Sequence, residues 1–597
     1  MPAPIHYRVE IGSLHAHLFH VTLTIARPAA LQRVALPVWI PGSYLVREFA
    51  KNLQGLQARQ RGALLTALQL DKCSWQIACS PDEALVLSYD VYAHDNSVRS
   101  AWLDANRGFF NGTSVCLKVE GQEATQHLLE LPTSSSVAGW SVATGLAPQR
   151  VDAKGFGSYA AAGYDELVDC PVEMGLFWSG SFTACGAPHR FVVAGAAPGF
   201  DGERLLADAQ KICESEIRFW HGADEKPPFE NYLFMLNAVD DGYGGLEHRN
   251  STALICSRKD LPRQGETKAP DGYTTLQGLI SHEYFHAWNV KRLRPSEFES
   301  YRYDRENYTS LLWFFEGFTS YYDDLLLRRA GLVDNAAYLK LLTKTVNQVL
   351  QAPGRLVQSV AEASFEAWVK YYRPDENTPN ATVSYYAKGA LVALCLDLTL
   401  RAEGHGTTLD DAMRGLWRAC RAGPMRETDV AAALEAAGRR SFAPELSDWV
   451  HGRGELPLKP LLEQHGVAVL EEPAQLAQRL GIRVTETQGV QIKTVLRGGA
   501  AEHAGFAAGD EWLGVEPAGQ AAAPGWRMSR LDDLLLYAGA AKKVIALVAR
   551  DRRLLRLELT LPPALTTWRL AVKDEALVNA WLDVNTANTA ATAPTRP

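Results

Sequence analysis

The chain has 597 residues, of which 47% are apolar and 21% are charged. This composition supplies a large core and excludes a collagen, a disulfide scaffold and a globally disordered chain. The 60 basic and 68 acidic residues give a net charge of −8. Such a balance argues against a nucleic-acid partner, because nucleic-acid binders usually carry a basic excess. At roughly 100–200 residues per domain, the length predicts three to five domains.

Residues 1–168 have the pattern of short β-strands, and we interpret them as a β-sandwich domain. Val, Leu, Ile and Tyr alternate with polar residues in several stretches. Turn signals such as Pro41-Gly42 separate these stretches. The examples are residues 14–25, 31–40 and 83–94.

Residues 169–455 change from strand to helix. A strand-like segment at 191–195 precedes a helical pattern at 204–220, and helical patterns dominate 274–450. Short strands return at 480–561. The final residues, 583–597, are small and polar, so we expect a disordered tail.

Targeting signals and disulfide patterns are missing from the sequence. Nine cysteines lie between Cys73 and Cys420 without a CxxC pair, which favours free thiols in a reducing compartment. The N-terminus alternates like a strand, and no stretch of about 18 apolar residues occurs. We therefore expect a cytoplasmic protein with no signal peptide and no membrane segment.

The strongest motif is the HExxH sequence at 282–286. On a helix, His282 and His286 share one face and can direct two imidazoles at one metal ion. Glu283 lies beside them and can act as a base on a metal-bound water. The motif predicts a zinc peptidase site.

Glu316 is the candidate third metal ligand. It lies in the apolar segment 310–326, where a lone buried carboxylate is costly unless it is paired or binds a metal. Two histidines and one glutamate form a catalytic zinc set with an open fourth position. Three nearer glutamates lie in a polar stretch and are expected to be solvated: Glu297, Glu299 and Glu306. Asp323 and Asp324 either orient a ligand histidine or face solvent.

These motifs, with several others, give the chain a recognisable family likeness. It resembles the glycyl aminopeptidase family of gluzincin zinc metallopeptidases that carry a C-terminal PDZ domain. The resemblance implies a multidomain α+β protein with four parts. The matching stretches are 36–50, 242–248, 281–295, 311–324 and 384–389. The expected parts are an N-terminal β-sandwich at 1–168, a thermolysin-like catalytic domain with a helical lobe at 169–455, a PDZ domain at 456–565 and a tail at 566–597.

The resemblance also implies roles for residues outside the zinc motif. Gly244, Gly245 and Glu247 match the exopeptidase strand, in which the glutamate binds the substrate's α-amine and the glycines admit its backbone. A carboxylate near zinc suits that role because it pairs with an ammonium. Tyr386 matches the tyrosine that stabilises the oxyanion, although the adjacent Tyr385 is an alternative.

Two further features of the resemblance leave alternatives open. Arg292 and Arg294 either hold structure or meet a peptide carboxylate. Within residues 489–516, the stretch Ala500 to Asp510 is similar to the short helix and following turn of a PDZ domain, which binds a peptide by adding it to a sheet edge. Residues 480–483 stand where the carboxylate-binding loop is expected but depart from its glycine-rich form, so the domain either binds a peptide C-terminus or is purely structural.

The sequence therefore predicts a zinc-dependent aminopeptidase that removes N-terminal Gly or Ala from peptides, with one Zn²⁺ per chain. Its expected partners are peptides with a free N-terminus and, at the PDZ domain, a peptide C-terminus; neither nucleic acid nor membrane is expected. The alternatives are a gluzincin endopeptidase and a non-catalytic PDZ peptide-binding protein.

Overall fold

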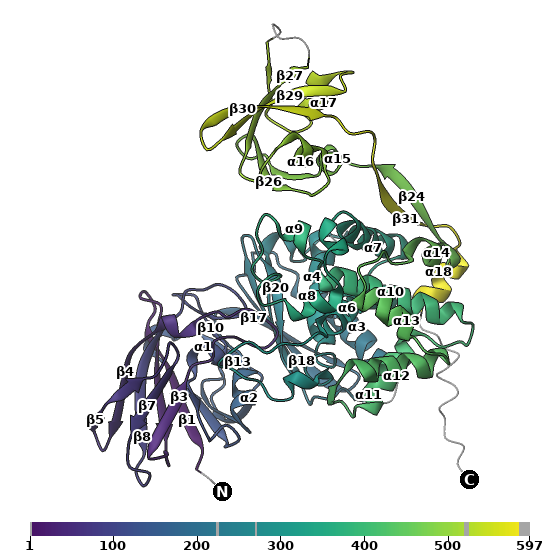
Figure 1. Ribbon diagram of the computed structural model, residues 1–597. Helices are drawn as coiled ribbons and strands as arrows, with labels where there is room; N and C mark the ends of the chain where they lie inside the picture. Colours follow the sequence, from purple (N-terminus) through teal and green to yellow (C-terminus); the bar gives the residue numbers. More distant parts are fainter. Residues whose placement is uncertain (1–2, 223–225, 269–270, 519–523, 584–597) are drawn as a thin grey trace, which may run out of the picture. The chain divides into compact units, whose positions relative to one another are not determined.

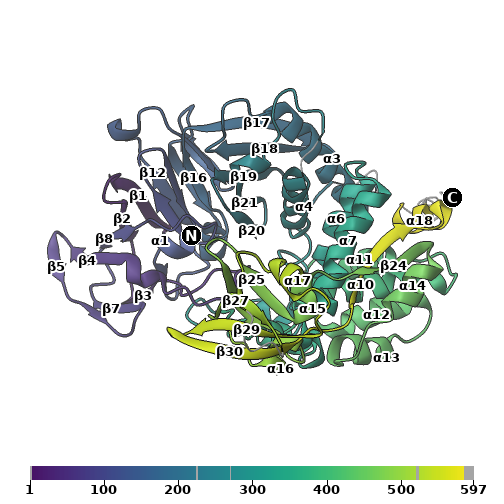
Figure 2. The same ribbon diagram turned by 90° about the horizontal axis from the view of Figure 1, so that it is seen from above.

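The computed structural model describes residues 3–222, 226–268, 271–518 and 524–583 (Figures 1 and 2). The chain divides into two compact units. The first comprises Met1–Tyr308, Tyr322–Leu332 and Met413–Asp429; the second comprises Thr309–Tyr321, Val333–Ala412 and Val430–Pro597. The expected disordered tail lies almost wholly outside the described residues.

The first unit opens with a β-rich region, as the alternating pattern predicts. Its largest sheet has eight strands, in the order β14-β15-β12-β1-β2-β8-β4-β5. Strict alternation of buried and half-buried residues in β2 places one face of the sheet in the core. The strands are β1 (Ile5–Ser13), β2 (Leu18–Ile25), β4 (Leu53–Gln60), β5 (Ala63–Leu65), β8 (Leu85–Tyr92), β12 (His127–Leu131), β14 (Ala147–Val151) and β15 (Gly157–Ala161).

Two four-stranded sheets complete this region, in the orders β13-β16-β10-β9 and β11-β3-β7-β6. The region is rich in β-structure past residue 168, because β16 pairs with both β10 and β13. The strands are β3 (Leu31–Ala35), β6 (Ala67–Gln69), β7 (Ser74–Ala78), β9 (Ala101–Leu103), β10 (Arg107–Phe110), β11 (Lys118–Val119), β13 (Ser141–Thr144) and β16 (Val172–Gly175).

A five-stranded sheet follows, in the order β17-β18-β19-β21-β20 (Figure 2). Its central strands β18, β19 and β21 run parallel, and β20 forms an antiparallel edge. Helix α4 (Asp271–Phe285) packs against this edge. The expected strand at 191–195 and helix at 204–220 are confirmed as β18 and α3. The elements are β17 (Phe177–Ala184), β18 (Ala187–Ala194), α3 (Gly202–His221), β19 (Tyr232–Val239), β20 (Tyr243–Glu247) and β21 (Ser251–Ser257).

The second unit contains the expected helices around α10 (Tyr385–Ala402). Gly389 of α10 comes so close to Gly317 that a Cβ on Gly317 would lie 2.5 Å from the Gly389 Cα. Two glycines thus let helices α5 and α6 approach α10. Other helices of this unit are α5 (Leu312–Phe315), α7 (Asn335–Leu350), α8 (Val360–Phe365) and α9 (Thr378–Ala381). Helices α6 (Gly317–Arg329) and α11 (Leu409–Ala419) are divided between the two units.

Among the described residues, one helical stretch has the length and composition of a membrane span. It covers Thr378–Ala402, with a mean hydropathy of 1.3 in its most apolar window. That window is 83% buried inside the protein, as in a core helix. The sequence predicts helix here, and polar residues such as Lys388 and Asp397 interrupt its apolar run, so the stretch does not count as an uninterrupted apolar segment.

The strands expected at 480–561 form a six-stranded sheet within the second unit. Its order is β25-β26-β27-β29-β30, with β28 paired to β27, and all pairings are antiparallel. Helix α16 (Ala500–Ala504) ends at Gly505, which has a φ of +87°. The strands are β25 (Ile482–Thr485), β26 (Val490–Val495), β27 (Glu511–Pro517), β28 (Trp526–Arg527), β29 (Lys543–Arg550) and β30 (Arg553–Thr560).

Candidate active site

The HExxH motif lies at the end of helix α4. The His286 N–H donates to the His282 carbonyl at 3.3 Å, so the helical turn continues through the second histidine. The two Nε2 atoms are 3.1 Å apart. Spacing of four residues on a helix thus brings both imidazoles to one point, as the sequence predicts.

Each histidine ring is held by its other nitrogen. His282 Nδ1 lies 3.0 Å from Asp323 Oδ2, and His286 Nδ1 lies 2.7 Å from the Asn289 carbonyl. Both partners accept hydrogen bonds, which favours the tautomer with the proton on Nδ1 and a lone pair on Nε2. A hydrogen bond at Nδ1 of this kind orients a histidine ring so that Nε2 can bind a metal.

Asp323 on α6 is a site residue for which the sequence left two roles open. The structure selects orientation of His282 over solvent exposure. Burial raises the pKa of the Asp323 carboxyl, and the hydrogen bond from His282 opposes that rise. The nearest sequence signal is its place seven residues after Glu316, two turns along a helix.

Strand β20 runs directly beside Glu283. A Cβ on Gly245 would lie 2.1 Å from Glu283 Oε1, so no side chain fits there. Gly244 has a φ of +155°, which other residues rarely adopt. The missing side chain at Gly245 therefore lets the edge strand approach Glu283 closely.

Glu247 ends the same strand and is 4% exposed. Its carboxylate, that of Glu283 and the His286 ring have ligand atoms within 4.8 Å of one another. Within the described part of the chain, no residue hydrogen-bonds to Glu247 Oε1. A buried carboxylate oxygen without a partner is costly, so this arrangement is suited to a cationic ligand.

In the second unit, Glu316 follows α5 and precedes α6, and it is 2% exposed. The expected buried helix is therefore present, with a one-residue interruption at Glu316. Of the three glutamates that lie nearer to the motif in sequence, Glu297 and Glu299 are exposed, as expected, whereas Glu306 is half-buried.

Tyr386 lies at the start of α10 and is less buried than Tyr385. Its hydroxyl is 3.3 Å from that of Tyr372. Burial, followed by the negative charge of Glu316, raises the pKa of Tyr386 well above its usual value. The phenol therefore keeps its proton at neutral pH and can act as a hydrogen-bond donor.

The donor chemistry of these residues fits a zinc ion. Within the first unit, His282 and His286 form one pair of possible metal ligands, and Glu247, Glu283 and His286 form a second group that could hold a cation. Two imidazoles and a carboxylate are typical zinc ligands, and both imidazole Nε2 atoms converge on one point. The second group is mainly acidic and offers charge rather than a zinc ligand set.

Comparison with known proteins agrees with this chemistry. The family model for M61 glycyl aminopeptidase matches residues 275–392, and that for the M61 peptidase N-terminal domain matches residues 6–176. The crystal structure of an aminopeptidase N family protein from Idiomarina loihiensis is 38% identical, with a TM-score of 0.91; the match covers 97% of this chain and all of that one. The protein belongs to the M61 glycyl aminopeptidase family. It is a zinc metallo-aminopeptidase and hence a hydrolase.

More distant structures also match this M61 family member. An M1 zinc metallopeptidase from Deinococcus radiodurans is 14% identical with a TM-score of 0.46, and the match covers 76% of this chain and 94% of that one. A mutant of that enzyme bound to a Tyr-Ser-Ala substrate is 13% identical with the same TM-score and coverage. Among curated proteins, no sequence matches the chain.

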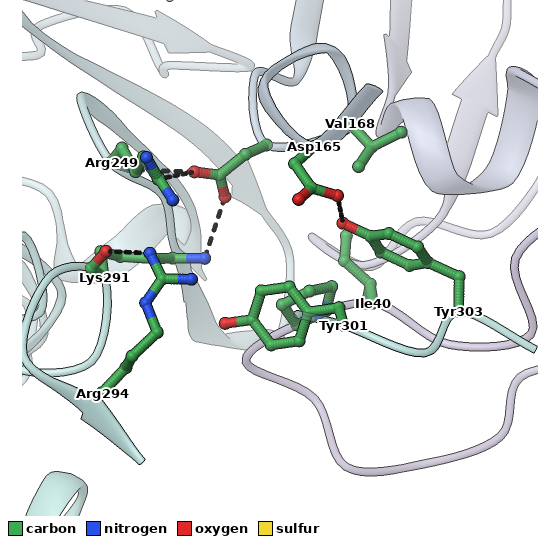
Figure 3. A pocket seen from close by; sticks show the side chains of 10 residues that line it. Ile40, Asp165, Val168, Arg249, Lys291, Arg294, Tyr301 and Tyr303 are labelled. Atoms are coloured by element: carbon green, nitrogen blue, oxygen red, sulfur yellow. Dashed lines mark hydrogen bonds and ion pairs between the residues drawn. The ribbon is translucent and has the colours of Figure 1, made fainter. Parts of the chain in front are cut away.

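A buried ionic network includes His248, the residue after Glu247, and its Lys291 and Arg249 are seen in Figure 3. Asp169 accepts hydrogen bonds from Lys291 Nζ at 2.9 Å, His248 Nδ1 at 3.1 Å and the Arg249 backbone N–H at 3.1 Å. Burial alone would raise the pKa of Asp169, but Lys291 and then His248 hold it far below its usual range. Sequence reasoning missed Asp169 and Lys291, because they are 122 positions apart.

The two arginines of the KRLRP segment have structural contacts. Arg292 donates to three backbone carbonyls, those of Ala287, Arg249 and Pro228. Arg294 donates to the Lys291 carbonyl at 2.9 Å and lines a pocket with Tyr301 and Tyr303 (Figure 3). These contacts favour the first of the two roles expected for the arginines.

Proposed function

We propose that this enzyme removes small N-terminal residues, Gly and Ala, from peptides with a free N-terminus. The observation that carries the proposal is the buried Glu247 carboxylate, whose Oε1 lacks a hydrogen bond in the described chain and which lies near Glu283. A carboxylate in that place favours a charged α-amine over a blocked one. The family description supports the preference for glycine.

His282, His286 and Glu316 would hold one Zn²⁺ per chain. A bound zinc ion would supply Lewis-acid chemistry, polarising the scissile carbonyl and making water a better nucleophile. Asp323 would orient His282 from behind, as its hydrogen bond to Nδ1 supports.

Glu283 would act as the general base and then the general acid. Its carboxylate takes a proton from the attacking water and returns one to the leaving amine. Gly244 and Gly245 let the substrate backbone pass along β20 within reach of this carboxylate, because neither carries a side chain.

Tyr386 would donate a hydrogen bond to the oxyanion of the tetrahedral intermediate. Its raised pKa supports this role, since the phenol remains a donor across the neutral range. Tyr385 is the less suited residue because its side chain is fully buried.

The domain assignment remains part of this proposal. We assign residues 1–168 to the β-sandwich, 169–455 to a thermolysin-like catalytic domain and 456–565 to a PDZ domain. The short helix α16 with Gly505, followed by strand β27, supports the PDZ assignment. A peptide C-terminus would add to its sheet at the edge strand β25.

One experiment on purified protein tests the function. Bound zinc is quantified, and hydrolysis of Gly-, Ala- and Leu-arylamides is compared with that of N-acetyl-Ala-arylamide, in wild type and Glu247→Ala. We expect near one zinc per chain, turnover of the Gly and Ala substrates, and a loss in Glu247→Ala that is confined to free-amine substrates. Cleavage of blocked substrates at equal rates would instead indicate an endopeptidase. Zinc-free protein without turnover would indicate a peptide-binding protein.

A further inference from the structure

A turn from the β-rich region reaches the Glu247 carboxylate. Ile40 and Ser43 form an isolated β-bridge around Pro41 and Gly42, and Gly42 has a φ of +91°. Proline followed by glycine at a positive φ is typical of a type II turn. The sequence predicts this turn but not its neighbour, which lies about 200 positions later in the chain.

Gly42 lies close to both oxygens of that carboxylate. A Cβ on Gly42 would lie 2.5 Å from both Glu247 Oε1 and Oε2, and 2.7 Å from Cδ. Both oxygens are nearer than the carboxyl carbon, so this position lies in front of the two oxygens, where a hydrogen-bond donor to the carboxylate would also lie. Because residue 42 is a glycine, no side chain fills that space.

The surroundings of the turn hold the other side of Glu247 in place. Pro41 lines the same pocket as Lys291 and Asp169 (Figure 3). Asp169 binds both Lys291 and His248, the residue after Glu247. The β-rich region thus contributes Asp169 and the Pro41-Gly42 turn to the environment of one carboxylate.

We propose that Gly42 is a positioning residue for substrate recognition: its backbone lies at the oxygens of Glu247, and its missing side chain leaves the space in front of them to the substrate's ammonium. The β-rich region would then determine specificity for a free N-terminus, although it supplies no catalytic group. This inference rests on the proposed function, in which Glu247 binds the ammonium.

The test compares Gly42→Ala with Gly121→Ala. Gly121 has a φ of +83° in a turn closed by the Gln122 N–H to Val119 carbonyl bond, and a Cβ there would meet nothing within 4 Å. Both variants carry the same backbone strain, but only Gly42→Ala places a methyl group on Glu247. Any difference between them therefore reports the contact with the carboxylate.

The readout is the contribution of the amine to inhibitor binding. For each variant, the inhibition constant of alanine hydroxamate is compared with that of propionohydroxamate, which lacks the amine. We expect the ratio of the propionohydroxamate inhibition constant to the alanine hydroxamate inhibition constant to shrink about 10-fold or more in Gly42→Ala, toward the ratio of Glu247→Ala. The zinc content should be unchanged. Gly121→Ala should keep the wild-type ratio. A wild-type ratio in Gly42→Ala would overturn the inference.

A double variant covers loss of folding and separates this inference from the function. Gly42→Ala combined with Glu247→Ala removes the clash, so it should fold like Glu247→Ala and show no further loss of amine recognition. If the double variant unfolds as readily as Gly42→Ala alone, Gly42 acts elsewhere and the inference is wrong. If wild type itself shows no preference for the amine, the proposed function fails first and the inference falls with it.

Discussion

At the scale of single residues, the site is organised by contacts behind the reacting groups. Both motif histidines are held through Nδ1, one by a carboxylate and one by a backbone carbonyl. Glu247 is instead buried with one oxygen lacking a hydrogen bond in the described chain. The first arrangement suits a metal ion that binds Nε2, and the second suits a cationic substrate group.

Glu283→Gln should abolish proton transfer without loss of the metal. We expect kcat to fall by about 10²–10⁴-fold, the usual contribution of general acid–base catalysis. Steady-state kinetics on Ala-arylamide and zinc analysis of the same samples measure the two effects. Turnover within a few-fold of wild type at full zinc content would contradict the assignment of Glu283 as the base.

Asp323→Asn should weaken metal binding rather than remove the base. Loss of the carboxylate behind His282 is expected to lower zinc affinity about 10–100-fold. Competition with a chelator of known affinity measures this change. The control is Asp208→Asn, because Asp208 accepts hydrogen bonds from Tyr273 and Gln277 on α4 but from neither motif histidine. Equal affinity in both variants would show that Asp323 has no specific role.

At the scale of elements, helix α4 and the edge strand β20 carry most residues of the proposed site in the first unit. The helix presents the motif, and the strand supplies Gly244, Gly245 and Glu247 in one short run. Close approach of a strand to a catalytic carboxylate requires a missing side chain at Gly245. The spacing between the two elements is therefore as important as the residues that they carry.

Gly245→Ala should impair catalysis because its methyl group would occupy the position of Glu283 Oε1. We expect kcat/KM to fall about 100-fold or more, as with other misplacements near 1 Å. The control is Gly415→Ala on α11, where a Cβ meets nothing within 4 Å and alanine favours a helix. That control should retain full activity and equal or higher thermal stability. Full activity of Gly245→Ala would show that β20 and Glu283 separate during catalysis.

At the scale of the whole molecule, the β-rich region contributes residues that lie close to Glu247, the proposed amine-binding residue of the same unit. Asp169 links Lys291 and His248, and the Pro41-Gly42 turn covers Glu247. Lys291 is 4% exposed, so its charge depends on this pairing. The β-rich region therefore supports the substrate end of the site as well as forming its own core.

Asp169→Asn should destabilise the first unit by about 3–5 kcal/mol at pH 7, since it leaves the buried Lys291 ammonium without its carboxylate. The pKa of Asp169 is depressed, so its stabilising effect is complete above about pH 4 and is lost as the pH falls through the folded-state pKa. Calorimetry should therefore show a difference from wild type that shrinks in acid.

The control for this variant is Asp165→Asn. Asp165 lines the same pocket but accepts a hydrogen bond from the Tyr303 hydroxyl rather than from a buried ammonium. At pH 7, the Asp165→Asn variant should lose less of the wild-type melting temperature than the Asp169→Asn variant. Equal melting temperatures for Asp169→Asn and wild type would show that the Asp169–Lys291 pair contributes no net stability.

The sequence by itself predicted the elements and residues whose signals are local. Apolar residues that repeat every two positions indicated the strands, and those that repeat about every four positions indicated the helices. The four-residue spacing of His282 and His286 indicated the metal site. Pro41-Gly42 likewise indicated a turn. The family resemblance drew attention to Glu247 and Tyr386, whose roles remain proposals.

Only the tertiary structure decided which distant residues surround those groups. Asp323 binds His282, Asp169 binds Lys291, and Gly42 lies on Glu247, although each pair is far apart in sequence. The sequence could not decide whether Asp323 orients a histidine or faces solvent, because the same helical position suits both a buried and an exposed carboxylate. Such pairings depend on how folded elements pack, and no local period or spacing along the chain encodes them.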